Sequence, residues 1–369
     1  MKRTGSPGGR IMTRIALGSL LMMGVACRLA AAEGTADVPA RMPAVQGTFY
    51  PADAEELAQE VDRLLAAGEG RDVDGSIRAL MAPHAGYRYS GAVAAAGFRQ
   101  LSADVSRVIV LAPSHRVGMR GGGSIPDVGA YRNALGDVPL APEAAELRER
   151  YGFFAAVEAA HRQEHSLEVM LPFLQRRLGP FTLIPVVLGQ SFDAEKMAEA
   201  LLPLLEDGDT VVVASSDLSH YHPYEKARKL DRACLQAVLD LDVARLQDQE
   251  LCGRMPVSVV LHLARKAGWQ PVEIEYRNSG DTAGSRDRVV GYGCVAFVDR
   301  GGAAGSESET RESESGGDTG PEAQAPPVSP EQRGQLMRLA RDSIHAALRK
   351  AALPTLPEGE IGRASGRER

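Results

Sequence analysis

The fold is indicated most clearly by residues 107–116, which read RVIVLAPSHR. An apolar run over Val108–Leu111 ends at a proline and a polar turn that carries a histidine. A short, continuous apolar run bounded by turn residues is typical of a strand buried on both faces of a sheet. The same construction occurs at residues 79–87, ALMAPHAGY, and at residues 211–220, VVVASSDLSH. Three such strands predict an α/β fold.

The same alternation of strand and helix patterns extends over residues 42–299, which we interpret as one continuous domain. The predicted strands are Ser76–Met81, Arg107–Leu111, Phe181–Leu188, Thr210–Ala214, Val272–Tyr276 and Val289–Val298. The predicted helices are Ala54–Ala67, Gly91–Gln100, Pro142–Tyr151, Glu168–Leu178, Asp193–Leu205, Tyr224–Leu241 and Pro256–Ala267. This order predicts a central, mostly parallel or mixed sheet flanked by helices.

Residues 1–32 have the three regions of a signal peptide. Basic residues come first, an uncharged apolar run follows over Ile15–Cys27, and Ala30–Ala32 supplies small residues for cleavage. The apolar run is short for a membrane-spanning helix. We therefore expect an exported protein, periplasmic or extracellular, with a cytoplasmic location as the alternative if the leader is not cleaved. A membrane is an expected partner only if Cys27 is lipidated.

The C-terminal part of the chain has a different composition. Gly, Ser, Glu and Pro dominate residues 300–330, which predicts a disordered linker. Helical spacing returns over Glu331–Lys350, and the chain ends soon afterwards. We interpret residues 331–369 as a fragment of a second domain that is cut off.

Composition narrows the class of protein. The chain has 369 residues and a net charge of -6, without the basic patch that a nucleic-acid partner requires. After cleavage of the leader, Cys234, Cys252 and Cys294 remain, an odd number that forms no disulfide framework. Cys234 and Cys294 lie among apolar residues and are expected in the core. Cys252 precedes a predicted helix, whose N-terminus favours a thiolate.

Two histidines are candidate metal ligands because of where they lie. His84 and His115 each follow a proline at the end of a predicted strand, and ligands in open α/β sheets bind beyond the carboxyl ends of the strands. The alternative is that each histidine only forms hydrogen bonds within its loop.

The third loop carries Asp217 and His220. They are either a carboxylate and imidazole that share a proton or two further ligands. Alternatively, Ser215, Ser216 or Asp217 caps a helix that starts there.

The segment Glu164–Glu168, EHSLE, opens a predicted helix. Its glutamates either reach the site or suit the N-terminus of that helix. The four remaining histidines are interpreted as structural or surface residues: His161, His222, His262 and His345.

Residues 42–299 resemble the Memo family, known in prokaryotes as AmmeMemoRadiSam system protein B. The motifs that carry the resemblance are, in order, QGTFYPAD at 46–53, PHAGY at 83–87 with YSG at 89–91, PSHR at 113–116, EHSLE at 164–168 with LPF at 171–173, SSDLSHY at 215–221, CGR at 252–254 and VVGY at 289–292. The resemblance implies a fold similar to class III extradiol dioxygenases.

The resemblance also implies a site. It places iron (Fe²⁺), or copper as the alternative, on His84, His115 and Cys252, with Asp217 and His220 as catalytic residues. The other residues expected to line the site are Tyr87, Ser114, Arg116, His165, Glu168 and Ser216. Dioxygenases of this fold use a carboxylate where Cys252 stands, so the thiolate favours iron or copper and departs from the ring-cleaving pattern.

Partners and function follow from the same resemblance. Residues 331–369 are similar to the start of an AMMECR-type domain, so AMMECR-type and radical S-adenosylmethionine system proteins are expected partners. A metal-dependent redox protein is the first hypothesis. The alternatives are a phosphopeptide- or protein-binding module that uses the same crevice, and a metal-free enzyme with Cys252 or Ser216 as nucleophile and His220 as base.

Overall fold

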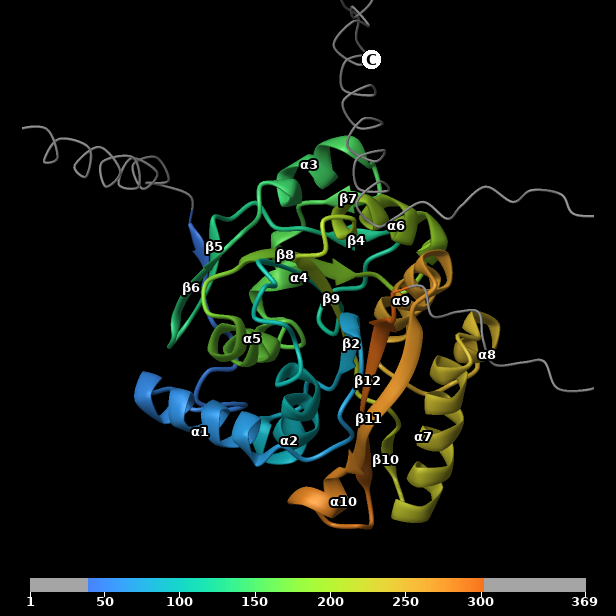
Figure 1. The fold of residues 1–369 in the computed structure, drawn as a ribbon. Helices are drawn as coiled ribbons and strands as arrows, with labels where there is room; N and C mark the ends of the chain where they lie inside the picture. The colour runs from blue at the N-terminus through green and yellow to red at the C-terminus, as the bar shows by residue number, and fades with distance from the viewer. Residues whose placement is uncertain (1–38, 302–369) are drawn as a thin grey trace, which may run out of the picture. The chain divides into compact units, whose positions relative to one another are not determined.

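The computed structural model describes residues 39–301 (Figure 1). The predicted leader with Cys27, the predicted linker beyond residue 301 and the helix predicted within residues 331–369 lie outside this range. No helix within 39–301 combines the length and the apolar character needed to cross a membrane.

The centre of the fold is a mixed sheet. Its four middle strands are parallel and lie in the order β2 (Ser76–Ala82), β9 (Thr210–Ser215), β3 (Arg107–Pro113) and β8 (Thr182–Leu188). On one side, β12 (Val289–Asp299) pairs antiparallel with β2, and both β11 (Gln270–Asn278) and β10 (His220–His222) pair with β12. On the other side, β4 (Gly123–Ser124) and β7 (Phe154–Ala155) extend the sheet. The predicted sheet flanked by helices is confirmed.

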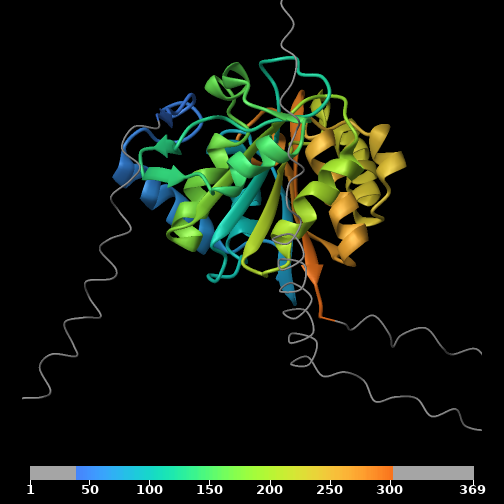
Figure 2. The same cartoon turned by 90° about the horizontal axis from the view of Figure 1, so that it is seen from above.

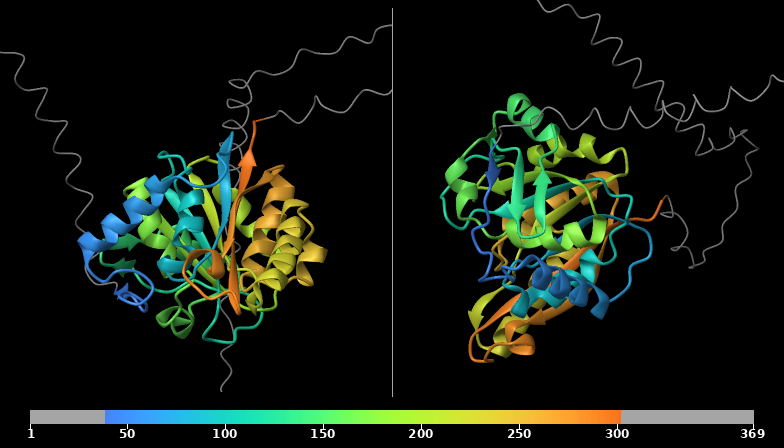
Figure 3. Two further views of the ribbon diagram at one scale, coloured as in Figure 1. Left: turned by 90° about the horizontal axis from the view of Figure 1, so that it is seen from below. Right: turned by 90° about the vertical axis from the view of Figure 1, so that its left-hand side faces the viewer.

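Successive residues of the middle strands point to opposite faces of the sheet, and both sets are apolar. Helices therefore cover both faces. Leu80, Val110 and Val213 face a cluster with α1 (Ala54–Ala67), α2 (Tyr87–Phe98) and α5 (Leu171–Leu178). Their neighbours in the strands, Met81 and Leu111, face a second cluster that includes α3 (Glu143–Arg150), α6 (Ala194–Leu201), α7 (Tyr224–Leu239) and α9 (Arg254–Ala267). Figures 2 and 3 show α1 on one side of the sheet and α7 and α9 on the other.

Smaller elements complete the described fold. A separate three-stranded sheet consists of β1 (Ala40–Arg41), β5 (Ala130–Asn133) and β6 (Gly136–Pro139). The short helices are α4 (Glu158–Arg162), η1 (Glu168–Met170), η2 (Leu202–Leu205), α8 (Val243–Gln247) and α10 (Ser279–Thr282).

Helix α1 matches its predicted bounds because both of its ends are encoded locally. Asp53 accepts hydrogen bonds from the backbone N–H groups of Glu55 and Glu56, which satisfies two free donors of the first turn. Gly68 ends the helix with φ of 61°, a conformation that favours glycine. By contrast, the predicted helices at Glu168–Leu178 and Asp193–Leu205 each contain a 3₁₀ segment.

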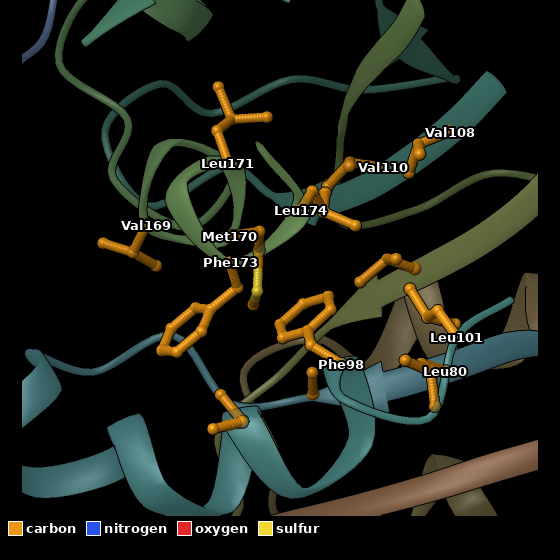
Figure 4. Close-up of a cluster of buried hydrophobic side chains, with 14 of the residues drawn as sticks. Leu80, Phe98, Leu101, Val108, Val110, Val169, Met170, Leu171, Phe173 and Leu174 are labelled. Atoms are coloured by element: carbon orange, nitrogen blue, oxygen red, sulfur yellow. The ribbon is translucent and has the colours of Figure 1, made fainter. Parts of the chain in front are cut away.

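The core between α2, α5 and the sheet is tightly packed (Figure 4). The Phe98 and Phe173 rings stack with centroids 5.4 Å apart and planes 10° apart. Nearby, α2 approaches the sheet at Gly97, where a Cβ atom would lie 2.4 Å from Cys294 Sγ. Cys234 and Cys294 are both buried free thiols, as predicted.

Gly97→Ala is expected to lower the free energy of unfolding by about 1–3 kcal/mol, because the added methyl group overlaps the Cys294 sulfur in a packed core. Adding Cys294→Ala should recover part of this loss, because the next contact of that methyl, with Leu80, is at 3.4 Å. Urea denaturation measures both effects. Gly152→Ala is the control, because no atom lies within 4 Å of the added methyl group. An equal loss of unfolding free energy in Gly97→Ala and Gly152→Ala would contradict this packing.

Candidate metal centre

The site lies where three strand ends meet. Strand β9 lies between β2 and β3, so the chain segments that follow these three strands leave the sheet side by side. They carry His84, His115 and the Ser215–Asp217 segment respectively. The predicted convergence of these loops is confirmed.

Three histidines form the candidate metal centre. Within residues 39–301, the group of side chains that could hold a metal ion consists of His84, His115 and His165, whose ligand atoms all lie within 4.8 Å of one another. Their ring centroids are 5.1 Å apart for His84 and His115, 5.4 Å for His84 and His165, and 4.7 Å for His115 and His165. His165 comes from the segment between α4 and η1, outside the three strand loops.

The hydrogen bonds of His84 determine which of its ring nitrogens is free. Its Nδ1 lies 2.6 Å from Ser215 Oγ, and the Ser215 hydroxyl donates its single proton to the carbonyl of Ser166 at 2.6 Å. Ser215 must therefore accept a hydrogen bond from Nδ1–H, which leaves the lone pair on Nε2. Burial, followed by the neighbouring histidines, holds the pKa of His84 well below its usual value, so the ring is neutral. A neutral imidazole with its lone pair on Nε2, the nitrogen that faces Cys252 Sγ, can bind a metal ion.

Glu164 orients His115. Its Oε1 lies 2.8 Å from His115 Nδ1, and its Oε2 accepts the backbone N–H of His115 at 2.7 Å. Burial alone would raise the pKa of Glu164, but the hydrogen bonds and charge of His115 outweigh it and lower the pKa to about 2. An ionised carboxylate only accepts hydrogen bonds, so Nδ1 of His115 carries a proton and Nε2 is free when the ring is neutral.

His165 has an imidazole nitrogen without a hydrogen-bond partner. Its Nδ1 is buried and unpaired, and it lies 3.4 Å from Glu164 Oε1. Burial lowers the pKa of His165 to about 4, so the ring is neutral near pH 7. A buried, unpaired nitrogen is costly unless something binds it. Three converging imidazoles, with this orphaned atom among them, fit a metal ion.

Cys252 lies beside this group. Its Sγ is 3.2 Å from His84 Nε2, and it accepts a hydrogen bond from the backbone N–H of Asp217 at 3.1 Å. The sulfur is outside the group of three histidines. We expected the helix N-terminus to favour a thiolate, but burial, followed by the charge of Asp217, raises the pKa of Cys252 instead.

Asp217 is a buried carboxyl group at the base of the site. Its Oδ1 accepts the backbone N–H of His84 at 2.8 Å, and its backbone carbonyl accepts the N–H of Cys252. Burial raises its pKa to about 7. The alternative prediction, that Ser215–Asp217 caps a helix, is wrong, because strand β10 follows this loop and α7 begins only at Tyr224.

His220 lies at the edge of the site in β10. Its backbone N–H donates to Glu250 Oε1 at 3.0 Å. A positive charge on the His220 ring would lower the pKa of His84. Burial lowers the pKa of the His220 ring itself. The following residue, Tyr221, is exposed and has φ of 60°, a strained conformation for a residue other than glycine.

Several predicted lining residues make hydrogen bonds that support the surrounding loops. Tyr87 donates to the carbonyl of Val169, and Ser114 donates to the carbonyl of Val117. The Ser216 hydroxyl accepts the N–H of Gly253 and donates to the carbonyl of Asp217, so both of its roles are used by the backbone. This disfavours Ser216 as a nucleophile. Arg116 is exposed next to His115.

Glu168 belongs to a buried network next to the site. It forms an ion pair with Arg41 and accepts hydrogen bonds from the Tyr50 hydroxyl and from the backbone of Ala44 and Val45. Its carboxylate therefore holds the segment that precedes α1. Glu168 is the first residue of η1, as the alternative interpretation of a charge at a helix N-terminus expects. Its hydrogen bonds and ion pair, however, go to the segment that precedes α1.

Sequence reasoning missed two supporting residues. Ser215 was considered only as a helix cap, whereas it sets the tautomer of His84. Arg41 lies just before the predicted domain and was not singled out, whereas it is buried and holds the His161–Glu168 segment. The proximity of His165 and Glu164 in the EHSLE motif was the available signal for a fourth loop at the site.

A groove begins beside the histidines. Phe49 packs on His165 with ring centroids 5.0 Å apart and also lines a pocket of about 710 Å³. Tyr87, Arg88 and Tyr89 line the same pocket. Its lining therefore contains aromatic rings and basic side chains, together with the carboxylates of Glu60 and Asp281.

Comparisons with known proteins agree on one family. Residues 41–296 match the family described as "Memo-like protein". A "MEMO1 family protein" of Sulfolobus acidocaldarius is 37% identical over 283 residues, which cover 70% of this chain and 99% of the relative. Relatives with the same description from Aeropyrum pernix and Aquifex aeolicus are 37% and 36% identical, over 69% and 70% of this chain and 98% and 99% of their own lengths.

His161 is a structural residue next to the site, as predicted. The Ser124 hydroxyl donates to the carbonyl of Val157, so it accepts a hydrogen bond from His161 Nε2 at 2.9 Å. On the other side of the ring, His161 Nδ1 lies 2.6 Å from the Tyr131 hydroxyl. Burial, followed by the charge of Arg41, lowers the pKa of His161 to about 3. The folded protein therefore keeps this ring neutral.

Between about pH 6.5 and pH 3 the unfolded chain binds a proton at His161 that the folded protein does not. Stability should therefore fall as the pH falls through this window, with a contribution of up to about 1.4 kcal/mol per pH unit from this residue. His161→Gln should reduce the slope of the unfolding free energy against pH by up to about 1.4 kcal/mol per pH unit, which corresponds to one bound proton. Urea denaturation between pH 5 and 7 measures this slope. Equal slopes for variant and wild type would contradict this assignment.

Proposed function

The chain belongs to the Memo-like protein family, and from this premise we propose that it is a non-haem metalloprotein with a redox function. The metal is Fe²⁺, with copper as the alternative. The observation that carries the proposal is the convergence of three imidazoles, one of which has a buried nitrogen without a partner.

His84, His115 and His165 are the nitrogen ligands in this proposal, and Cys252 supplies a sulfur ligand from the side of His84. Imidazole suits iron, copper and zinc, and a thiolate shifts the preference towards the softer of these ions. Burial disfavours the thiolate in the absence of a metal, so a metal that binds Cys252 must also displace its proton.

The metal would supply electron transfer, and the residues around it would handle protons. Asp217 has a pKa of about 7, so it can either hold or accept a proton near neutral pH. Burial lowers the pKa of His220, at the edge of the site, so its neutral ring offers a second proton acceptor near neutral pH.

Metal content tests this proposal directly. Protein purified without chelator should contain about one equivalent of iron or copper, and His84→Ala should lose most of it because one of the three imidazole ligands is removed. His262→Ala, which removes a partly buried histidine of α9 outside the group of three, is the matched control and should retain the metal. Redox cycling of the bound metal, followed by its visible absorption, tests the redox part.

Near-zero metal in the wild-type protein, also after reconstitution with Fe²⁺ or Cu²⁺, would refute the proposal. Equal metal content in His84→Ala and wild type would refute the assignment of the site. A bound metal that cannot be oxidised or reduced would leave a metal-binding protein without the redox function.

The groove favours a second candidate function, a module that binds phosphopeptides or proteins. It begins at Phe49, and Arg88 and Tyr89 offer a positive charge and an aromatic surface. Phosphotyrosine peptides should then bind equally well to wild type and to His84→Ala, and Arg88→Ala should weaken binding. Fluorescence anisotropy with a labelled peptide measures this, and the absence of binding to either protein removes the second candidate.

A further inference from the structure

One buried carboxylate connects two of the three histidines. Besides His115, Glu164 Oε1 accepts the backbone N–H of His165 at 3.1 Å and that of Ser166 at 3.0 Å, and it accepts the Ser166 hydroxyl at 2.8 Å. Its side chain is only 1% exposed. Glu164 therefore fixes the loop of His165 as well as the ring of His115.

The position of Glu164 is itself fixed by Arg41, which lies in β1 of the separate three-stranded sheet. Arg41 Nη2 donates to the Glu164 carbonyl at 2.6 Å, Arg41 Nε donates to the His161 carbonyl at 3.0 Å, and the same guanidinium pairs with Glu168. One buried arginine in β1 thus holds the segment that carries Glu164 at three points. A carboxylate on such a rigid segment has a defined direction relative to the two imidazoles.

We propose that Glu164 is the positioning residue of the metal centre, which orients His115 and His165 together and places one negative charge behind the ligands. This inference rests on the proposed metal-binding function. A carboxylate that accepts a hydrogen bond from the distal N–H of a ligand histidine fixes its tautomer and increases its strength as an electron-pair donor to the metal. Here one carboxylate acts on two ligands, so its loss should disturb the geometry of both.

Glutamine cannot reproduce these contacts although it has the same shape. Both carboxylate oxygens of Glu164 accept hydrogen bonds, one from His115 N–H and the other from His115 Nδ1 and Ser166. An amide group has one acceptor oxygen, and its NH₂ group would face a donor on one side. The substitution also removes the negative charge.

Binding of Co²⁺, used alone as a spectroscopic probe under anaerobic conditions, tests the proposal. Glu164→Gln should bind Co²⁺ about 10–100-fold more weakly than wild type and should shift the visible absorption bands of the bound ion. Glu143→Gln is the matched control, because it removes a partly buried carboxylate that pairs with Arg107 at the opposite end of β3. The control should leave the affinity and the bands unchanged.

Equal affinity and equal bands for Glu164→Gln and wild type would overturn the proposal while leaving the metal site intact. Equal weakening in both variants would overturn it as well, because the effect would then be general. Failure of the wild-type protein to bind Co²⁺ would refute the proposed metal site together with this inference.

A measurement on the wild-type protein keeps the proposal testable if Glu164→Gln does not fold. Nitrogen-15 NMR of the histidine rings, with His115 assigned through His115→Gln, reports the tautomer of the metal-free protein. The proposal expects the proton of His115 on Nδ1. A proton on Nε2 would show that Glu164 does not orient the ring, and would overturn the proposal.

Discussion

The site depends on the parallel pairing of β9 between β2 and β3. Val212 is aligned with Ala79 on one side and with Ile109 on the other, so one register fixes the positions of all three strands. A slip of β9 by one residue would exchange the side chains that face the two helical clusters and disturb the packing of both, so it is disfavoured. Because the register is fixed, the loops with His84, His115 and Asp217 emerge at the same edge of the sheet. The two helical clusters stabilise this arrangement from both faces.

The electrostatics of the site favour a cation. Burial keeps His84 and His165 neutral, so they offer lone pairs rather than positive charges. Glu164 remains ionised because His115 and the backbone donate to it. Imidazole lone pairs with one buried carboxylate behind them form an environment that stabilises a bound divalent ion more than it stabilises bound water.

The sequence was sufficient to predict the middle of the sheet, because the strands around Val108–Leu111 are apolar on both faces and end in clear turn signals. For the same reason, His84 and His115 were recognised as residues at strand ends. Short strands such as β4, β7 and β10 have two or three residues, and their pairing depends on distant partners that leave no local pattern. The resemblance placed His165 among the residues that line the site. Its position among the candidate ligands and its link to Glu164 became apparent only in three dimensions, because their segment lies between α4 and η1 and is held by the distant Arg41.

The central claim is that a metal ion binds among His84, His115 and His165. Crystals of the protein loaded with Fe²⁺ or Cu²⁺, measured at the absorption edge of the metal, test it most directly. The account predicts one anomalous peak among these three rings, at about 2.0–2.3 Å from their nitrogens. A map without a peak there, or with the metal bound elsewhere on residues 39–301, would contradict it.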